Sequence, residues 1–240
     1  MKPKQSTKLP TTIRINKHMA DKGLSSRREA DELIEKGLVL VNGKKATMGM
    51  QIDPTKDKVE LKGKKSSYVY YMYNKPIGIE TTGAQGEEVD ILRHTKFSKD
   101  VFPVGRLDKD SHGLILMTND RRITHRLLDP KFTHEKEYRV TIKKEVTGNF
   151  SKKLEVGMEI DGVKTKSTKV YRESPNTFRI ILTEGKNRQI RKMVEAAGDT
   201  VIDLLRLRIE NIKLGDLQTG AFKSVPGKEM AVLLKKLGLS

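Results

Sequence analysis

Cysteine is absent from the 240 residues of this sequence. Disulfides, thiolate catalysis, zinc-ribbon sites and iron–sulfur clusters are therefore excluded together. The absence is compatible with a reducing compartment, so we expect a cytoplasmic location. Tryptophan is absent as well, and aromatic residues make up only 5% of the chain. We therefore expect no extended base-stacking surface, and individual tyrosines would have to perform any stacking.

Long apolar runs are missing too. No stretch approaches the about 18 uninterrupted apolar residues that a membrane span needs, and the polar residues 1–10 do not have the apolar core of a secretory signal. We therefore expect no membrane association. The sequence also has no H-E-x-x-H motif, no G-x-x-x-x-G-K-[ST] phosphate loop and no G-x-G-x-x-G fingerprint. Together with the wide dispersal of the histidines, this predicts that neither a metal nor a cofactor takes part.

Acidic residues are fewer than basic ones: the chain has 31 aspartates and glutamates and 48 lysines and arginines, so its formal net charge is +17. The first 65 residues alone carry 16 basic and 8 acidic side chains. Such an excess suits a polyanionic partner, because lysines and arginines that contact phosphates release condensed counterions. The charge by itself does not distinguish RNA, DNA and acidic lipid.

The N-terminal quarter has the pattern of a small helical unit that ends in a hairpin. A short helix is predicted at 13–20. Ser26 and Glu29 have the spacing of a capping box, in which each side chain accepts a hydrogen bond from the backbone of the other residue. Asn42 and Gly43 are a strong signal for a tight hairpin turn.

Arg27 and Arg28 lie in the first turn of the second predicted helix, where the helix dipole disfavours cations. Their position is more favourable if phosphate groups bind there, attracted by the side chains and by the free backbone amides. Two solvated arginines are an equally good interpretation of these residues alone.

Residues 68–240 have scattered strands mixed with helices and no regular alternation, which favours an α+β fold. A strand at 68–73 is expected to be broken by the segment 74–78. A helix capped by Asp120 is expected to follow the strand that begins at residue 114. We predict a flexible basic arm at 1–11, a small basic domain at 12–62, a polar linker at 63–67 and a larger domain at 68–240.

Asp108 lies two residues after Arg106 in a loop between two apolar segments, 101–104 and 114–117, which are predicted strands. Loops between strands often carry catalytic groups, although an aspartate in such a place is more often a turn or capping residue. Further along the chain, Arg188 and Arg191 are three residues apart, so both can project from one side of the start of a helix.

The string F-P-V-G-R-L-D-K-D-S-H-G-L-I-L-M-T-N-D at 102–120 strongly resembles the active-site motif of RNA pseudouridine synthases of the RsuA, RluB, RluE and RluF family. Four further segments continue the resemblance: 74–78, 135–138, 184–193 and 205–209. The residues from 13 to about 60 are similar to the S4 RNA-binding domain that precedes the catalytic domain in this family. The residues around Ser111 are most similar to the RluF-type branch, which modifies 23S rRNA.

The resemblance implies an α+β protein in which a small S4 domain of αL type precedes the catalytic domain. The sheet of that catalytic domain is expected to be mixed, mainly antiparallel and flanked by helices. The implied activity is the isomerisation of uridine to pseudouridine at specific sites in ribosomal RNA, without a cofactor. A monomer is expected by the same analogy.

The resemblance also implies a role for each site residue. Asp108 is expected to start cleavage of the bond between uridine N1 and C1′, Tyr138 to stack on the target base, and Arg191 to pair with Asp108. Arg106 is expected to fill the space that the flipped-out uridine leaves. Further RNA contacts are predicted at five basic residues: Arg27, Arg28, Lys75, Lys186 and Arg188.

Two alternatives remain open from the sequence. The chain could be a non-catalytic RNA-binding or ribosome-assembly factor, in which Tyr138 is a core strand residue and Arg191 a solvated cation. The same enzyme class could also act on tRNA. A carboxylate placed like Asp108 argues against a pure RNA-binding protein, because binding the RNA backbone does not need an acidic side chain.

Overall fold

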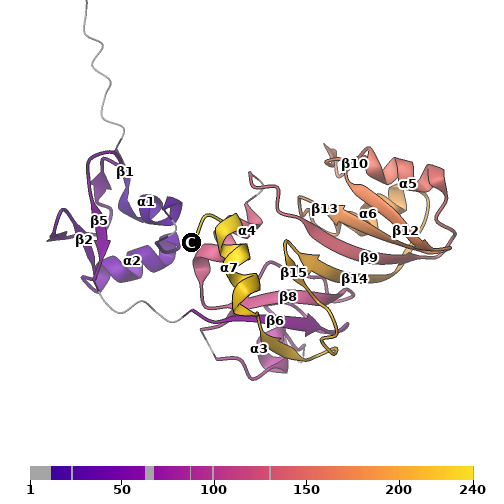
Figure 1. Ribbon diagram of the computed structural model, residues 1–240, viewed down its shortest axis with the longest axis horizontal. Helices are drawn as coiled ribbons and strands as arrows, with labels where there is room; N and C mark the ends of the chain where they lie inside the picture. The colour runs from indigo at the N-terminus through magenta and orange to yellow at the C-terminus, as the bar shows by residue number, and fades with distance from the viewer. Residues whose placement is uncertain are drawn as a thin grey trace, which may run out of the picture. The chain divides into compact units, whose positions relative to one another are not determined.

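The computed structural model describes residues 12–22, 24–62, 68–86, 88–98, 100–129 and 131–239. The chain divides into two compact units, Met1–Ser67 and Tyr68–Ser240 (Figure 1). The expected basic arm at 1–11 and the expected linker at 63–67 lie outside the described residues.

The first unit combines two short helices with short strands. In chain order its elements are β1 (Ile13–Arg14), α1 (Ile15–Asp21), α2 (Arg27–Glu35), β2 (Val39–Val41), β3 (Lys44–Lys45), β4 (Gln51–Ile52) and β5 (Val59–Leu61). Strand β2 lies between β3 and β5 in an antiparallel sheet, and β1 pairs with β4. Both helices and β2 contribute to one apolar core, so the unit holds together by burial of that core.

Local sequence signals place the elements of this unit well. The backbone amide of Glu29 donates to Ser26 Oγ at 3.2 Å, and the amide of Ser26 donates to Glu29 Oε2 at 3.3 Å, which confirms the predicted capping box. The hairpin turn is confirmed as well, with positive φ angles of 51° at Asn42 and 80° at Gly43. The helix predicted at 13–20 begins two residues later, because its first two residues pair with β4.

The second unit contains a large sheet with helices packed on it. Its elements are β6 (Tyr70–Lys75), α3 (Ile91–His94), β7 (Phe102–Val104), β8 (His112–Thr118), α4 (Arg121–Leu128), β9 (Lys136–Ile142), α5 (Gly148–Glu155), β10 (Glu159–Ile160), β11 (Val163–Lys164), β12 (Lys169–Ser174), β13 (Thr177–Leu182), α6 (Gln189–Ala196), β14 (Val201–Ile209), β15 (Ile212–Lys213), β16 (Phe222–Ser224) and α7 (Gly227–Lys236).

The strands of the large sheet follow the order β12-β13-β9-β14-β8-β6-β16, with β15 paired to β14 and β7 paired to β8. Strands β8 and β14 run parallel, whereas the other strand pairs of this sheet among the described residues are antiparallel. The predicted α+β fold with a mixed, mainly antiparallel sheet is therefore confirmed. The parallel pair connects the β6–β8 part of the sheet to the β9–β13 part.

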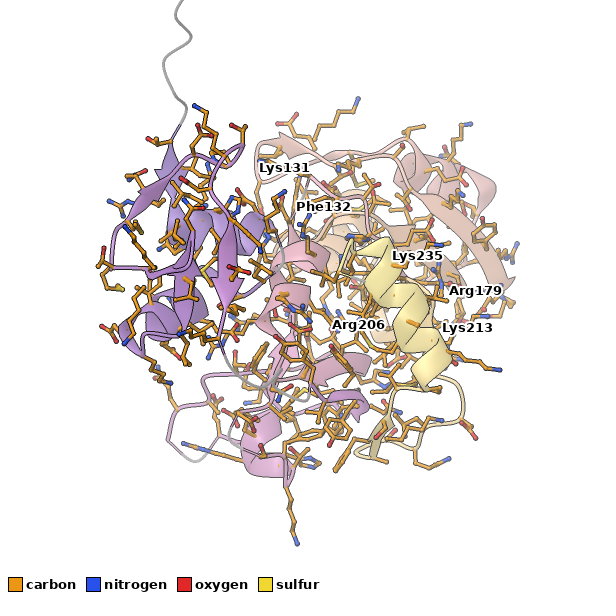
Figure 2. All side chains as sticks on the ribbon, turned by 60° about the vertical axis from the view of Figure 1, so that its left-hand side comes forward. Lys131, Phe132, Arg179, Arg206, Lys213 and Lys235 are labelled. Carbon is orange, nitrogen blue, oxygen red and sulfur yellow. The ribbon has the colours of Figure 1, made fainter. Side chains whose placement is uncertain are left out.

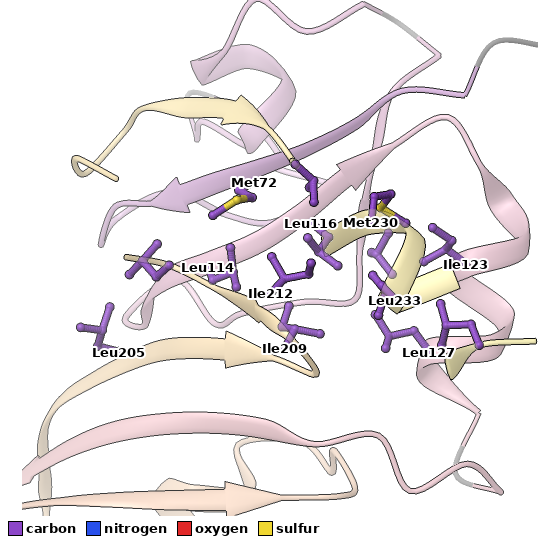
Figure 3. Close-up of a cluster of buried hydrophobic side chains, with 14 residues drawn as sticks. Met72, Leu114, Leu116, Ile123, Leu127, Leu205, Ile209, Ile212, Met230 and Leu233 are labelled. Carbon is purple, nitrogen blue, oxygen red and sulfur yellow. The ribbon is translucent and has the colours of Figure 1, made fainter. Parts of the chain in front are cut away.

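Each part of the sheet has its own apolar core. Side chains of β6, β8 and β14 pack against α4 and α7, as Figure 3 shows for Leu116, Ile123 and Leu233. Side chains of β9 and β13 pack against α5 and α6 in a second cluster. The two cores thus anchor the sheet on both sides of the parallel pair β8 and β14.

One sequence prediction for this unit was wrong, and one helix was not predicted. The strand predicted to break at Asn74 continues through Lys75, because the Asn74 side-chain amide donates to the Leu217 carbonyl at 2.7 Å and so has a partner in the interior. Helix α5 was overlooked, although Thr147 caps it by accepting from the Phe150 amide. In the described part of the chain, every helix is too short or too polar to span a bilayer.

Candidate active site

A pocket of about 830 Å³ opens in the second unit where the β7–β8 loop meets β9, β14 and the segment before α6. Predicted site residues from distant parts of the sequence line it: Arg106, Asp108, Tyr138, Lys186 and Arg188. Its size is within the range of pockets that hold small molecules or a single nucleotide. Phe132, labelled in Figure 2, lines the same pocket from the segment after α4.

Asp108 lies at the wall of this pocket with its side chain 33% exposed. Its backbone carbonyl accepts from the Ser111 amide at 3.0 Å and so closes a turn. The carboxylate itself accepts no hydrogen bond from any other described residue, so it takes no part in the turn. The position of Asp108 thus combines a turn backbone with a carboxylate that is available to a ligand.

The cation nearest to this carboxylate is Arg188, whose Nη1 lies 3.7 Å from Asp108 Oδ2. Arg188 also donates two hydrogen bonds to Asp110, at 3.2 and 2.9 Å. It occupies the N-cap of α6 with a left-handed backbone, φ 50°. The side chain therefore points from the start of the helix toward the β7–β8 loop.

The predicted pairing of Arg191 with Asp108 was wrong in this structure. The Nε of Arg191 lies 3.3 Å from Asp110 Oδ2, and its Nη2 donates to the Asp110 carbonyl at 2.8 Å and to Ser111 Oγ at 3.2 Å. These three contacts hold the guanidinium beside the second half of the loop. Burial raises the pKa of Asp110, but hydrogen bonding by Arg188 and the charge of Arg191 outweigh it and keep the pKa below its ordinary value.

Tyr138 lies in β9, directly across from Arg206 in β14 and from Ile180 in β13. Its side chain is partly buried against two apolar clusters and also lines the pocket. It therefore has a structural role in the sheet, and it presents surface to a ligand beside Asp108.

Lys75 was predicted to contact RNA, and the structure contradicts this. Its side chain is fully buried, at 0% exposure. The ammonium donates to the carbonyls of Pro76 at 2.9 Å and Ile79 at 2.7 Å. A buried ammonium with backbone partners cannot contact a phosphate on the surface. Lys75 instead stabilises the turn that follows β6.

Burial lowers the pKa of Lys75 from its ordinary 10.5 to about 8, although the charges of Glu80, Asp108 and Asp110 oppose the shift. Between these two pH values the unfolded chain binds more protons than the folded chain, so Lys75 makes the free energy of unfolding rise with pH. We expect this free energy to increase by about 2 kcal/mol more in the wild type than in Lys75→Met between about pH 8 and pH 10. Urea denaturation at several pH values checks this, and parallel curves for the two proteins would contradict it.

Two further cations in the pocket wall were not predicted. Arg206 in β14 is only 2% exposed, and its Nε donates to the Leu114 carbonyl at 2.6 Å (labelled in Figure 2). Its Nη1 donates to the Arg106 carbonyl at 3.4 Å, so this guanidinium connects both ends of the β7–β8 loop. The second cation is Lys136. Burial and the charge of Arg206 lower its pKa, and the charge of Glu210 opposes this shift. An arginine between two leucines in a buried strand was the available sequence signal.

Metal ligands do not gather at this site. Within the described residues, no group of three or more histidine, aspartate or glutamate side chains is arranged to hold a metal ion.

Arg27 and Arg28 lie at the exposed start of α2 in the first unit. Each unit therefore carries its own set of predicted RNA contacts.

Comparison with known proteins gives two family matches. Residues 69–196 match the model described as RNA pseudouridylate synthase, and residues 13–58 match the S4 domain. The dual-specificity RNA pseudouridine synthase RluF of Escherichia coli K12 is 42% identical over 94% of this chain and 79% of that protein. The ribosomal large subunit pseudouridine synthase B of Bacillus subtilis is 32% identical over 90% of this chain and 93% of that protein. A crystal structure of a pseudouridylate synthase matches with a TM-score of 0.68 and 27% identity, over 92% of this chain and 99% of that one.

Proposed function

Because the chain belongs to the RNA pseudouridine synthase family, we propose that it converts selected uridines of ribosomal RNA to pseudouridine. The family and the S4 domain that the sequence predicted are both confirmed. The name of the Bacillus subtilis relative supports large-subunit rRNA as the substrate. The words "dual-specificity" in the name of the Escherichia coli relative support a second RNA substrate, for which tRNA is our candidate. A cytoplasmic location is part of the same proposal.

The observation that carries this proposal is the Asp108 carboxylate in the wall of a nucleotide-sized pocket, 33% exposed and without a hydrogen bond from any other described residue. The reaction breaks the bond between N1 and C1′, rotates the uracil and joins C5 to C1′. N1 gains a proton and C5 loses one, so the product has the same atoms as the substrate. A carboxylate suits the first step whether it attacks C1′ or removes a proton from the ribose. Either route requires that the uridine leaves its stack and enters the pocket.

The other side chains of the pocket have supporting roles in this proposal. Tyr138 offers an aromatic surface for the target base and a hydroxyl for proton transfer. Arg188 Nη1 lies 3.7 Å from Asp108 Oδ2 and forms the ion pair that the resemblance assigned to Arg191. Arg106 is exposed beside Asp108, where it can occupy the space that the uridine leaves. Lys186 and Arg188 then provide positive charge for the flanking phosphates.

The experiment that tests the proposal is an activity assay with the purified chain. Uridine-containing fragments of 23S rRNA and intact tRNA are incubated with the protein, and pseudouridine is located by chemical mapping. We expect product at a small number of positions in the rRNA. Binding without product on every rRNA and tRNA fragment would contradict the proposal and support the non-catalytic RNA-binding protein.

The first unit supplies a separate prediction about binding. Replacing both Arg27 and Arg28 with alanine is expected to weaken RNA binding about tenfold. The slope of log affinity against log salt should decrease by about 2, because each phosphate contact contributes about 1. The matched control is the double alanine variant of Lys44 and Lys45, which removes two exposed charges from β3 of the same unit. Equal losses in both variants would show that only net charge matters at this surface.

A further inference from the structure

The backbone of Leu107, the residue directly before Asp108, is held by one hydroxyl group. Thr81 Oγ1 donates to the Leu107 carbonyl at 2.6 Å and accepts from the Leu107 amide at 3.0 Å. Thr81 is fully buried, and the Leu107 side chain belongs to a buried cluster with Tyr73 and Ile115. Both backbone polar groups of Leu107 therefore depend on Thr81 in a region that excludes water.

The same chain segment also holds the residue after Asp108. The Gly78 amide donates to the Lys109 carbonyl at 2.8 Å. The turn that contains Gly78 is closed by the Lys75 ammonium, which donates to the carbonyls of Pro76 and Ile79. The segment 75–81 thus contacts the backbone on both sides of Asp108.

We propose that Thr81 is a positioning residue for the isomerisation, which fixes the direction of the Asp108 carboxylate by holding the backbone amide and carbonyl of Leu107. This inference rests on the proposed function. The carboxylate accepts no hydrogen bond from another described residue, and its ion pair with Arg188 is long at 3.7 Å, so the backbone is the main constraint on its direction. A rotation of the backbone at Leu107 displaces the carboxylate, and a displacement of about 1 Å from the reacting atom can lower a rate about 100-fold.

The chemistry of the hydroxyl explains why threonine suits this position. A hydroxyl donates one hydrogen bond and accepts others at the same time, so it can satisfy the amide and the carbonyl of a single residue. Serine keeps this capacity. Valine has nearly the same shape as threonine but neither donates nor accepts, so Thr81→Val removes both hydrogen bonds without opening a cavity.

The second unit offers a closely matched control at Thr118. This threonine is also buried, donates to a backbone carbonyl at 2.6 Å and accepts from a backbone amide at 3.0 Å. Its partners are Val69 and Asp120, and it does not line the pocket. Thr118→Val therefore loses the same two hydrogen bonds away from Asp108.

The test compares kcat, KM, RNA affinity and the unfolding midpoint of the full-length variants. For Thr81→Val we expect kcat to fall about 10- to 100-fold, with KM and RNA affinity within about threefold of wild type. Thr81→Ser should restore kcat to within about threefold of wild type. Thr118→Val should lower the unfolding midpoint as much as Thr81→Val does and leave kcat within about threefold. If Thr81→Val keeps more than half of the wild-type kcat, or if Thr118→Val loses as much kcat, the proposal is wrong.

Amide hydrogen exchange in residues 105–112 provides a readout that does not need activity. Faster exchange is expected in this loop for Thr81→Val, and wild-type exchange for Thr118→Val and Thr81→Ser. Unchanged protection in Thr81→Val would overturn the positioning role. An inactive wild type whose loop loses protection on this substitution would instead contradict the proposed function and leave the contact between Thr81 and the loop supported.

Discussion

Asp108→Asn is expected to lower turnover at least about 1000-fold, because the amide keeps the size of the side chain and loses its charge. An amide can neither attack C1′ nor remove a proton from the ribose, and it cannot stabilise positive charge at C1′. RNA affinity should stay within about threefold of wild type, since the cations of the pocket and of the first unit remain. Single-turnover assays with 23S rRNA fragments, together with filter binding, measure the two quantities separately.

Asp110→Asn is the matched control, since Asp110 lies two residues further in the same loop and its side chain is 46% exposed. Asp110 also lines the pocket, but its carboxylate is bound by Arg188 at 2.9 Å and by Arg191 at 3.3 Å. We expect about a tenfold loss of turnover from the release of these two arginines. If the two variants lose equal activity, or if Asp108→Asn retains more than about 1% of it, Asp108 does not carry the reaction.

The largest effect on stability is expected at Gly113, where β8 meets β14. A Cβ placed on Gly113 would lie 2.5 Å from the Arg206 carbonyl oxygen and 2.8 Å from the Arg206 backbone nitrogen. Both contacts are with the backbone of a buried strand, so neither neighbour can move aside cheaply. The φ angle of 105° adds strain for any residue with a side chain. We expect Gly113→Ala to lower the free energy of unfolding by at least about 3 kcal/mol, measured by urea denaturation.

Gly198 provides the control for the backbone strain alone. It has a similar φ of 93°, and nothing lies within 4 Å of a Cβ placed on it. Gly198→Ala is therefore expected to cost only about 1 kcal/mol, the usual penalty for a side chain in this conformation. If Gly113→Ala is no more harmful than Gly198→Ala, the close approach of β8 and β14 does not limit this position.

Short-range signals in the sequence predicted local structure reliably. The capping box of Ser26 and Glu29 and the turn at Asn42 involve contacts within about four residues, so they are visible in any window of the chain. Asp108 was also located correctly in a loop between two strands, because the apolar segments on both sides of it are continuous. The resemblance of the segment 102–120 supplied the family and its chemistry.

Contacts between distant segments were the ones that the sequence could not decide. Whether Arg188 or Arg191 pairs with Asp108 depends on how α6 approaches a loop about 80 residues earlier, and both arginines suit the helix start equally well. Lys75 was interpreted as a surface cation because nothing near it in the sequence shows that the carbonyls of the following turn surround it. No local pattern in the sequence points to Thr81, because the only described hydrogen-bond partner of its side chain is the distant backbone of Leu107.

At Arg188, the backbone conformation and the contact with Asp108 favour different residues. Its left-handed conformation, φ 50°, costs a residue with a side chain about 1 kcal/mol that glycine would avoid. Glycine at this position would also remove the guanidinium that lies 3.7 Å from Asp108. Under the proposed function, backbone stability therefore favours glycine at the N-cap of α6, whereas the ion pair with Asp108 favours arginine.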